Sequence, residues 1–191
     1  YFSETLTKTS DTFLQNQAIF GKVYFPRLIA PLSITLTGLI KMFIQFGLFA
    51  IVYVWFLIKG VDVKPNIYAL LFPVLILILA NLSLGFGIII SSMTTKYRDL
   101  KFLIQFAVQL WMFATPVIYP LSVMEGSWSK YLWLIQANPV TAVMETFKYG
   151  FLGEGTFTWF SLGYSFLFSF VIIFLGIIVF NKVERSFMDV I

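Results

Sequence analysis

The chain has 191 residues, of which 59% are hydrophobic and only 12% are charged, and its formal net charge is +4. Soluble domains carry about 25% charged residues, so this composition excludes an ordinary soluble domain and predicts an integral membrane protein. The absence of cysteine and histidine excludes disulfides, thiol catalysis and the usual zinc sites. Because the first residue is Tyr1 and not methionine, we expect the natural start to lie upstream.

Residues 1–15, YFSETLTKTSDTFLQ, are rich in hydroxyl groups and include acidic and basic residues. Such a face does not suit contact with lipid. One interpretation is a cytoplasmic amphipathic helix. The other is the end of an earlier membrane span whose hydroxyl groups face a polar lumen. Composition alone favours the first interpretation.

The next segment, NQAIFGKVYFPR at residues 16–27, is called the elbow from here on. A short helix here would end before Pro26, because proline disfavours the helical conformation of the residue that precedes it. One interpretation is a juxtamembrane anchor in which Lys22 and Arg27 contact lipid phosphates. The other is a docking point for a cytoplasmic partner. Residue types alone favour the anchor.

Four apolar segments follow the elbow, and they match the length of about 20 residues that a membrane span needs. They lack the alternation of barrel strands, and backbone groups in lipid must bond internally, so we expect helices. The predicted spans are residues 28–58, 67–90, 102–119 and 160–180. Eight cations flank one side of these spans and four flank the other. The positive-inside rule therefore places the elbow, residues 94–101 and the tail at residues 181–191 in the cytoplasm.

Polar and small residues mark the first two spans. Lys41 would lie about 20 Å along the first helix, where a charge is costly. It either faces protein or water near Gln45, or it snorkels to a shifted span boundary. In the second span, Ser83, Gly87 and Ser91 recur every four residues. Such a small-residue stripe is typical of close helix packing.

The third span carries a face that we call the aromatic face, which consists of Phe102, Phe106, Gln109 and Phe113. Aromatic rings and an amide suit the C–H faces and the hydroxyl groups of sugars. The chain has 23 phenylalanines, however, so spacing alone favours an ordinary lipid-facing or packed stripe. We expect the pairs Thr115-Pro116 and Tyr119-Pro120 to break this helix near the outer surface.

The segment between the third and fourth spans is called the outer hairpin and covers residues 121–152. Asn138 followed by Pro139 predicts a helix start, because asparagine caps helix N-termini and proline suits the first helical position. An apolar stripe at helical spacing follows, and Gly150 and Gly153 predict the end of the helix. Ahead of this helix, SVMEGSWSKYLWLI at residues 122–135 could form a second short helix or an interfacial turn. We therefore expect a hairpin that dips into the membrane surface.

The sequence lacks the usual chemistry of an autonomous pump or enzyme. It has no GxxxxGK phosphate loop. None of its 9 acidic residues lies inside the apolar part of a predicted span, where proton-coupled carriers need such groups. No nucleophile with a neighbouring base is evident. Any transport would therefore draw its energy from another subunit.

Five motifs occur in order along the chain: KVYFPR, TTKYRDLK, TPVIYP, NPVTAVMETFKYGFLG and VERSFMDVI. Together they resemble the transmembrane subunit of type-2 ABC exporters of polysaccharides, the O-antigen, capsule and teichoic-acid group. The resemblance implies an all-α polytopic domain in the bacterial cytoplasmic (inner) membrane, with a cytoplasmic C-terminus. It also implies a homodimer with two ATP-binding cassette ATPase subunits, which hold ATP and Mg. The partners are then membrane lipid and a lipid-linked glycan, with no nucleic acid and no cofactor in this chain.

The family has six spans, so the resemblance implies that the first is absent here and that residues 1–15 are what remains of the second. This reverses the preference for a cytoplasmic helix, and the hydroxyl-rich face would line the export path. The resemblance also makes the elbow a coupling helix and reverses the preference for an anchor. Its proline and aromatic residues would give a stiff connection that passes the movement of the ATPase to the spans.

The resemblance assigns roles to three groups of residues. Contacts to the ATPase are expected from Asn16, Ile19, Lys22, Val23, Tyr24, Phe25, Pro26 and Arg27. The glycan channel is expected at Phe102, Phe106, Gln109, Phe113 and Tyr119. The exit gate is expected at Pro116, Pro120, Asn138, Pro139 and Glu145, in or next to the outer hairpin.

The function expected from these features is ATP-driven export of a lipid-linked polysaccharide, with no catalytic activity in this chain. The alternative is a type-2 ABC exporter of drugs or other small molecules. Two rivals come from other classes. One is a membrane scaffold that only recruits a soluble partner. The other is an enzyme acting on polyprenyl-linked sugars, which the scarcity of carboxylates disfavours.

Overall fold

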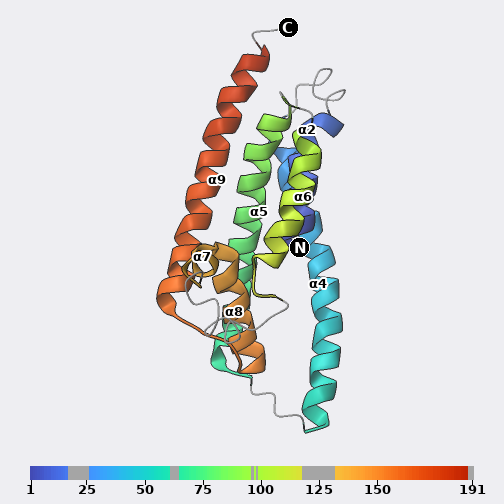
Figure 1. The fold of residues 1–191 in the computed structure, drawn as a ribbon. Coiled ribbons are helices and arrows are strands. Elements are labelled where there is room, and N and C mark those ends of the chain that lie inside the picture. Colours follow the sequence, from blue (N-terminus) through green and yellow to red (C-terminus); the bar gives the residue numbers. More distant parts are fainter. Residues whose placement is uncertain (17–25, 61–64, 96, 98, 118–131, 189–191) are drawn as a thin grey trace. The chain divides into compact units, whose positions relative to one another are not determined.

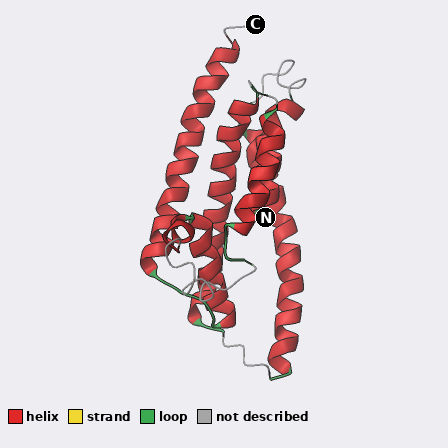
Figure 2. Cartoon of the chain, viewed as in Figure 1, coloured by secondary structure: helices red, strands yellow, loops and turns green. Residues whose placement is uncertain are grey.

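A computed structural model describes residues 1–16, 26–60, 65–95, 97, 99–117 and 132–188, with side chains up to residue 183. This part of the chain is helical and contains no strand, so the predicted all-α class is confirmed (Figure 2). Figure 1 labels the elements in chain order. They are α1 (Phe2–Ser10), α2 (Thr12–Gln15), α4 (Ile29–Ile58), the 3-10 helix η1 (Ile67–Leu71), α5 (Phe72–Thr94), α6 (Leu100–Phe113), α7 (Leu132–Ala137), α8 (Pro139–Leu152) and α9 (Trp159–Met188).

Three helical stretches in the described part are long and apolar enough to cross a membrane. They are Ile29–Ile58, Ile67–Thr94 and Trp159–Val183. Their starts lie within one residue of the predicted spans at residues 28–58, 67–90 and 160–180. Many large apolar side chains of α4 are exposed in this chain, as expected of a helix that meets lipid or another membrane helix.

Helix α6 is shorter than the segment predicted at residues 102–119. It has 14 residues and is therefore about 21 Å long, which is less than the hydrocarbon core of about 30 Å. It ends at Phe113, before Pro116, which has no backbone N–H to donate. The Thr115 hydroxyl instead donates to the carbonyl of Trp111 at 3.0 Å. The predicted helix break at Thr115-Pro116 is thus confirmed, whereas Tyr119 and Pro120 lie outside the described residues.

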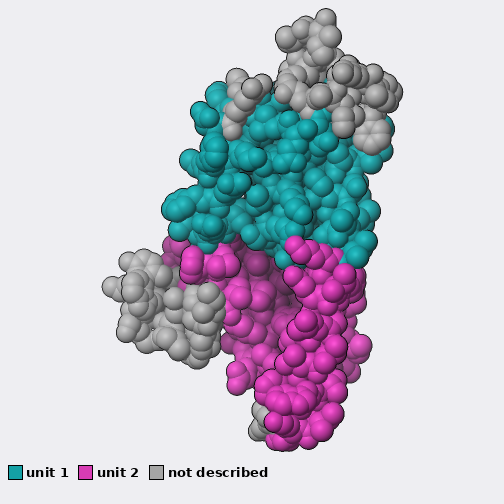
Figure 3. Space-filling model, turned by 90° about the vertical axis from the view of Figure 1, so that its right-hand side faces the viewer, with its two compact units in different colours: residues 1–40, 80–110, 169–191 teal, residues 41–79, 111–168 magenta. Residues whose placement is uncertain are grey.

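The chain divides into two compact units, which Figure 3 shows in different colours. Unit 1 consists of residues 1–40, 80–110 and 169–191. Unit 2 consists of residues 41–79 and 111–168.

Close helix contacts at glycine build the interior of unit 1. A Cβ atom on Gly87 would lie 2.5 Å from Thr9, and one on Gly85 would lie 2.8 Å from the backbone of Ile173. Helix α5 therefore meets α1 on one side and α9 on another at distances that only glycine allows. Ser83 and Ser91 are fully buried. The small-residue stripe of the second span is thus a packing surface, as predicted.

The hydroxyl-rich face of α1 and α2 is buried inside unit 1. Thr5, Thr9, Ser10 and Thr12 are each at most 2% exposed. The expectation that this face lines an export path is therefore wrong for these residues. For Ser10 and Thr12 the physical reason is that their hydroxyl groups donate to the carbonyls of Thr7 and Lys8 in the same stretch. A hydroxyl satisfied within its own helix can pack against another helix without facing water.

Aromatic rings fill the interior of unit 2, where α8 packs against α4 and α5. The Tyr53 hydroxyl donates to the carbonyl of Phe151, and the amide of Asn66 donates to the carbonyl of Gly150 at 2.9 Å. A Cβ atom on Gly150 would lie 2.8 Å from the backbone nitrogen of Ala69, so α8 and η1 are in direct backbone contact. The rings that contact one another in this interior are Phe46, Phe49, Phe72, Phe147 and Phe151.

Candidate functional site

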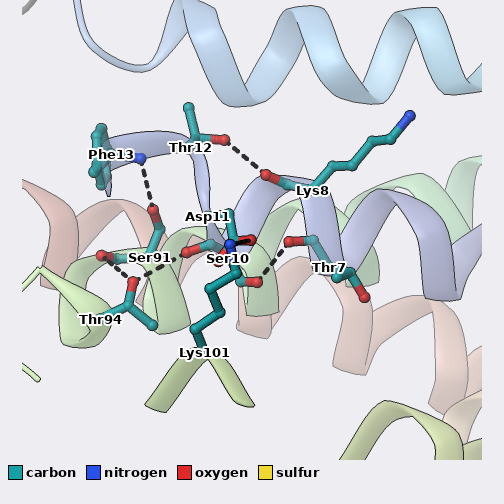
Figure 4. A network of polar contacts seen from close by, with 9 residues as sticks. All are labelled: Thr7, Lys8, Ser10, Asp11, Thr12, Phe13, Ser91, Thr94 and Lys101. Carbon is teal, nitrogen blue, oxygen red and sulfur yellow. Dashed lines mark hydrogen bonds and ion pairs between the residues drawn. The ribbon is translucent and has the colours of Figure 1, made fainter. Parts of the chain in front are cut away.

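The polypeptide immediately before the elbow is fixed by polar contacts to α5 and α6 (Figure 4). The Thr94 hydroxyl donates to the carbonyl of Ser10 at 3.0 Å, and the amide of Phe13 donates to the Ser91 hydroxyl at 3.4 Å. Between these two contacts, the Lys101 ammonium lies 2.8 Å from Oδ2 of Asp11. The start of α6 and the end of α5 therefore both hold the segment that leads into the elbow.

Three of the elbow residues assigned to ATPase contacts are described. Asn16 follows α2, and its side-chain amide donates to the carbonyl of Thr12 at 2.9 Å. Pro26 is exposed, and its carbonyl accepts the amide of Ile29 at 3.0 Å at the start of α4. Arg27 lies in the same turn and is half-buried. Five further residues lie outside the described part, namely Ile19, Lys22, Val23, Tyr24 and Phe25, so the coupling role of the elbow stays a prediction.

The aromatic face of α6 is exposed in this chain. Phe102 is 71% exposed, Phe106 is 62% exposed and Phe113 is 61% exposed, and Gln109 on the same face is also exposed. Val108 points the other way and is buried. Exposure in one chain suits contact with lipid, with a second chain or with a sugar, so the channel role stays a prediction.

Asn138 connects the start of α8 to the end of α6 within unit 2. Its Oδ1 accepts the amide of Val140 and the indole N–H of Trp111, both at 3.1 Å. Its Nδ2 donates to the Thr115 hydroxyl at 3.0 Å. The predicted N-cap at Asn138 and the helix start at Pro139 are therefore confirmed, and the cap also holds the residues beyond α6.

Glu145 lies in α8 and is buried among polar partners. One carboxylate oxygen is 3.4 Å from the Lys148 ammonium, and the other accepts the amide of Thr156 at 3.1 Å. Lys148 also donates to the carbonyl of Pro116. These contacts tie α8 both to the turn after α6 and to the segment that leads into α9. The predicted helix end is confirmed as well, because Gly153 caps α8 in the left-handed conformation with φ +75°.

A small open cavity lies beside this hairpin, with a volume of about 360 Å³. Its walls are mostly apolar and come from the end of α6, from α7 and from the start of α8. The lining residues are Trp111, Ala114, Leu134, Ile135, Ala137, Asn138 and Pro139. Among the described residues, no group of acidic, histidine or cysteine side chains could hold a metal ion.

Sequence reasoning missed several residues of this site. Trp111, Thr115 and Lys148 were not singled out as partners of Asn138 and Glu145, and neither were Asp11 and Lys101. Lys148 had a local signal, because it follows Glu145 by three positions on one helix face. The other partners lie far apart in the sequence and had no such signal.

Comparison with known families identifies the chain. The family model described as ABC-2 type transporter matches residues 2–152. The chain belongs to this family. It is thus a multi-pass membrane protein of the ABC transporter class.

Curated relatives are similar over much of the chain at low identity. The O-antigen export system permease protein RfbA of Myxococcus xanthus is 26% identical over 148 residues, which cover 78% of this chain. Two proteins of the same name from Klebsiella pneumoniae are 22% identical and cover the whole chain. The matched region spans 55% of the Myxococcus protein and 70% of each Klebsiella protein.

Proposed function

We propose that this chain is the permease of an exporter that moves a lipid-linked polysaccharide, such as O-antigen, capsule or teichoic acid, across the bacterial cytoplasmic membrane. It acts as a homodimer with two ATP-binding subunits, which bind ATP and Mg and supply the energy. The C-terminus lies in the cytoplasm, on the side with more cations. The observation that carries this proposal is the similarity to three O-antigen export permeases over most of the chain.

The exposed aromatic face of α6 supports a sugar substrate. Its rings offer flat apolar surfaces to the C–H faces of sugars, and Gln109 offers both a donor and an acceptor to hydroxyl groups. A polymer must slide along its path, so shallow stacking contacts suit it better than a deep pocket with many fixed hydrogen bonds. The same face in the second copy would complete the channel.

The outer hairpin suits the role of an exit gate. Its helix α8 is held at the start by Asn138 and further along by Glu145 and Lys148, so it moves as a stiff unit with the end of α6. A gate built in this way would respond to a shift of α6 without unfolding. The assignment of Pro116, Pro120 and Pro139 to this gate rests on the same proposal.

The coupling of ATP hydrolysis to export requires a mechanical contact with the ATP-binding subunits. The elbow supplies it, since Pro26 stiffens its exit and the Pro26 carbonyl bonds directly to the start of α4. ATP binding then shifts the dimer between closed and open paths, because the partner contacts the elbow differently in the two states.

The test uses the full-length protein in a strain from which its gene has been deleted. Phe106→Ala and Phe113→Ala are expected to lower surface polysaccharide while the permease remains in the membrane. The matched control is Phe160→Ala in α9, which removes an 85% exposed ring outside the aromatic face.

The deletion itself separates the proposal from its main alternative. Loss of surface polysaccharide on deletion supports the polysaccharide exporter. Unchanged polysaccharide together with increased sensitivity to a drug would show an exporter of small molecules. If Phe160→Ala lowers export as much as the two α6 variants, the channel assignment fails.

A further inference from the structure

We propose that the ion pair between Asp11 and Lys101 transmits movement from the elbow to α6, and thereby to the aromatic face. The two residues are positioning residues for transport and need not touch the substrate. This inference rests on the proposed function, because it takes the elbow as the point that receives the movement of the ATP-binding subunit.

The pair lies within unit 1, close in sequence to the start of the elbow. Asp11 occupies the single non-helical position between α1 and α2, and α2 leads directly to Asn16 at the start of the elbow. Lys101 lies in the first turn of α6 and is followed immediately by Phe102 of the aromatic face. Nζ of Lys101 lies 2.8 Å from Oδ2 of Asp11. Figure 4 shows the two side chains together.

The burial of Asp11 makes this contact unlike an ordinary surface ion pair. The Asp11 side chain is 7% exposed and the Lys101 side chain is 35% exposed. Removing a charge from water is costly, and a buried carboxylate without its cation is strongly disfavoured. Asp11 and Lys101 are therefore expected to move together, whereas the two members of an exposed pair separate at little cost.

The neighbouring contacts stop the segment around Asp11 from moving alone. The carbonyl of Ser10 accepts the Thr94 hydroxyl of α5, and the ring of Phe13 stacks on Phe180 of α9 with centroids 5.3 Å apart. These contacts hold the segment on both sides of Asp11 to two long helices. A shift of the elbow is then passed on, rather than absorbed by local bending.

The chain offers a matched control for a purely electrostatic effect. Glu4 and Lys8 form an ion pair at 2.9 Å in α1, with side chains 39% and 62% exposed. It is of the same chemical type and lies in the same unit, but it joins two residues of one helix. If the proposal is right, neutralising this pair has no effect on coupling.

The test measures the movement of α6 in the full-length transporter, assembled with its ATP-binding subunits in liposomes. Leu103→Cys places a thiol on an exposed position of α6, within a sequence of 191 residues that has no other cysteine. The readout is the change in maleimide labelling rate on adding ATP, together with the rate of ATP hydrolysis. Neither measurement requires the substrate to be known.

Asp11→Asn and Lys101→Gln are expected to reduce the ATP-dependent change in labelling by about fivefold or more, the lower end of measured coupling effects. ATP hydrolysis should continue. Lys101→Arg keeps the charge and should retain the response, and Glu4→Gln should leave it unchanged.

Three results would overturn the inference. They are a normal labelling response in Asp11→Asn or Lys101→Gln, an equal loss in Glu4→Gln, or the absence of any ATP response in the parent protein. A different result would be an ATP response in the parent protein that the Asp11→Asn variant loses, in a transporter that moves no polysaccharide. The proposed substrate would then be wrong, and the coupling role of the ion pair would stand.

Discussion

The indole N–H of Trp111 donates to Oδ1 of Asn138, and the same oxygen caps α8 by accepting the amide of Val140. One side-chain oxygen thus accepts a hydrogen bond from the first turn of α8 and another from a residue at the end of α6. Its amino group reaches the Thr115 hydroxyl as well. The join between α6 and α8 in unit 2 therefore depends on an asparagine side chain that both accepts and donates hydrogen bonds.

Replacement of Asn138 should therefore separate its capping role from its bridging role. Asn138→Ala loses the cap, worth about 1 kcal/mol. It also loses the two side-chain hydrogen bonds to Trp111 and Thr115, which brings the expected loss of unfolding free energy to about 2–3 kcal/mol. Asn138→Asp keeps both acceptor contacts and loses only the donation to Thr115, so its loss should be smaller. The loss of stability in both variants is measured by thermal unfolding in detergent. Equal loss in the two variants would contradict the bridging role of the oxygen.

Gly87 should not tolerate a methyl group. The added Cβ would lie 2.5 Å from two atoms of Thr9, which is fully buried and branched at Cβ and so cannot move aside. Overpacking of this kind costs about 1–3 kcal/mol, so Gly87→Ala should lower the unfolding temperature and the amount of protein in the membrane. Apart from its chain neighbours and its own helix backbone, no described atom lies within 4 Å of a Cβ atom placed on Gly163 of α9. Gly163→Ala is therefore the control and should be neutral or slightly stabilising, since alanine favours helix by about 1 kcal/mol.

Much of the fold could be predicted from the sequence because the membrane leaves few choices. Long apolar runs must be helices, and their starts agree with the structure. The start of α8 was also predictable, because Asn138 and Pro139 act on their own helix through neighbouring backbone groups. Signals of this kind lie within one or two turns of the residues that they determine.

The packing partners could not be predicted in the same way. Thr94 and Ser10 are 84 positions apart, and nothing in either residue indicates the other. The hydroxyl groups of α1 indicated a polar lumen by composition, yet Ser10 and Thr12 bond to carbonyls of their own stretch and are buried. Glu145 was expected at a gate, but its role in joining α8 to the turn after α6 depends on Lys148 and on the Pro116 carbonyl.

The pair of Glu145 and Lys148 should behave as a buried ion pair in mutant cycles. Lys148→Met leaves the Glu145 carboxylate, with a side chain only 5% exposed, without its cation. This should cost about 3 kcal/mol of unfolding free energy. Glu145→Gln should cost less, because Lys148 is 19% exposed and keeps its hydrogen bond to the Pro116 carbonyl. The double variant should recover part of the loss, as interacting sites do in a mutant cycle. Strict additivity, measured by chemical denaturation, would contradict the coupling.

The elbow should be required for binding or coupling of the ATP-binding subunits. Tyr24→Ala combined with Arg27→Ala removes an aromatic ring and a cation, the residue types that dominate interface energies. We expect co-purification of the ATP-binding subunit to fall by about tenfold, or hydrolysis to continue without export. The measurement compares subunit stoichiometry and export in the full-length complex.

The matched control for the elbow lies at the other end of α4, where the Lys59 ammonium is 4.0 Å from the centre of the Trp55 ring. Trp55→Ala with Lys59→Ala removes the same two kinds of side chain from a region that faces away from the cytoplasm in the proposed topology. If both double variants weaken the complex equally, the residues of the elbow serve only to anchor α4 in the membrane. A loss confined to the elbow variant supports the transfer of movement through it, since anchoring by aromatic and basic residues acts at both membrane surfaces alike.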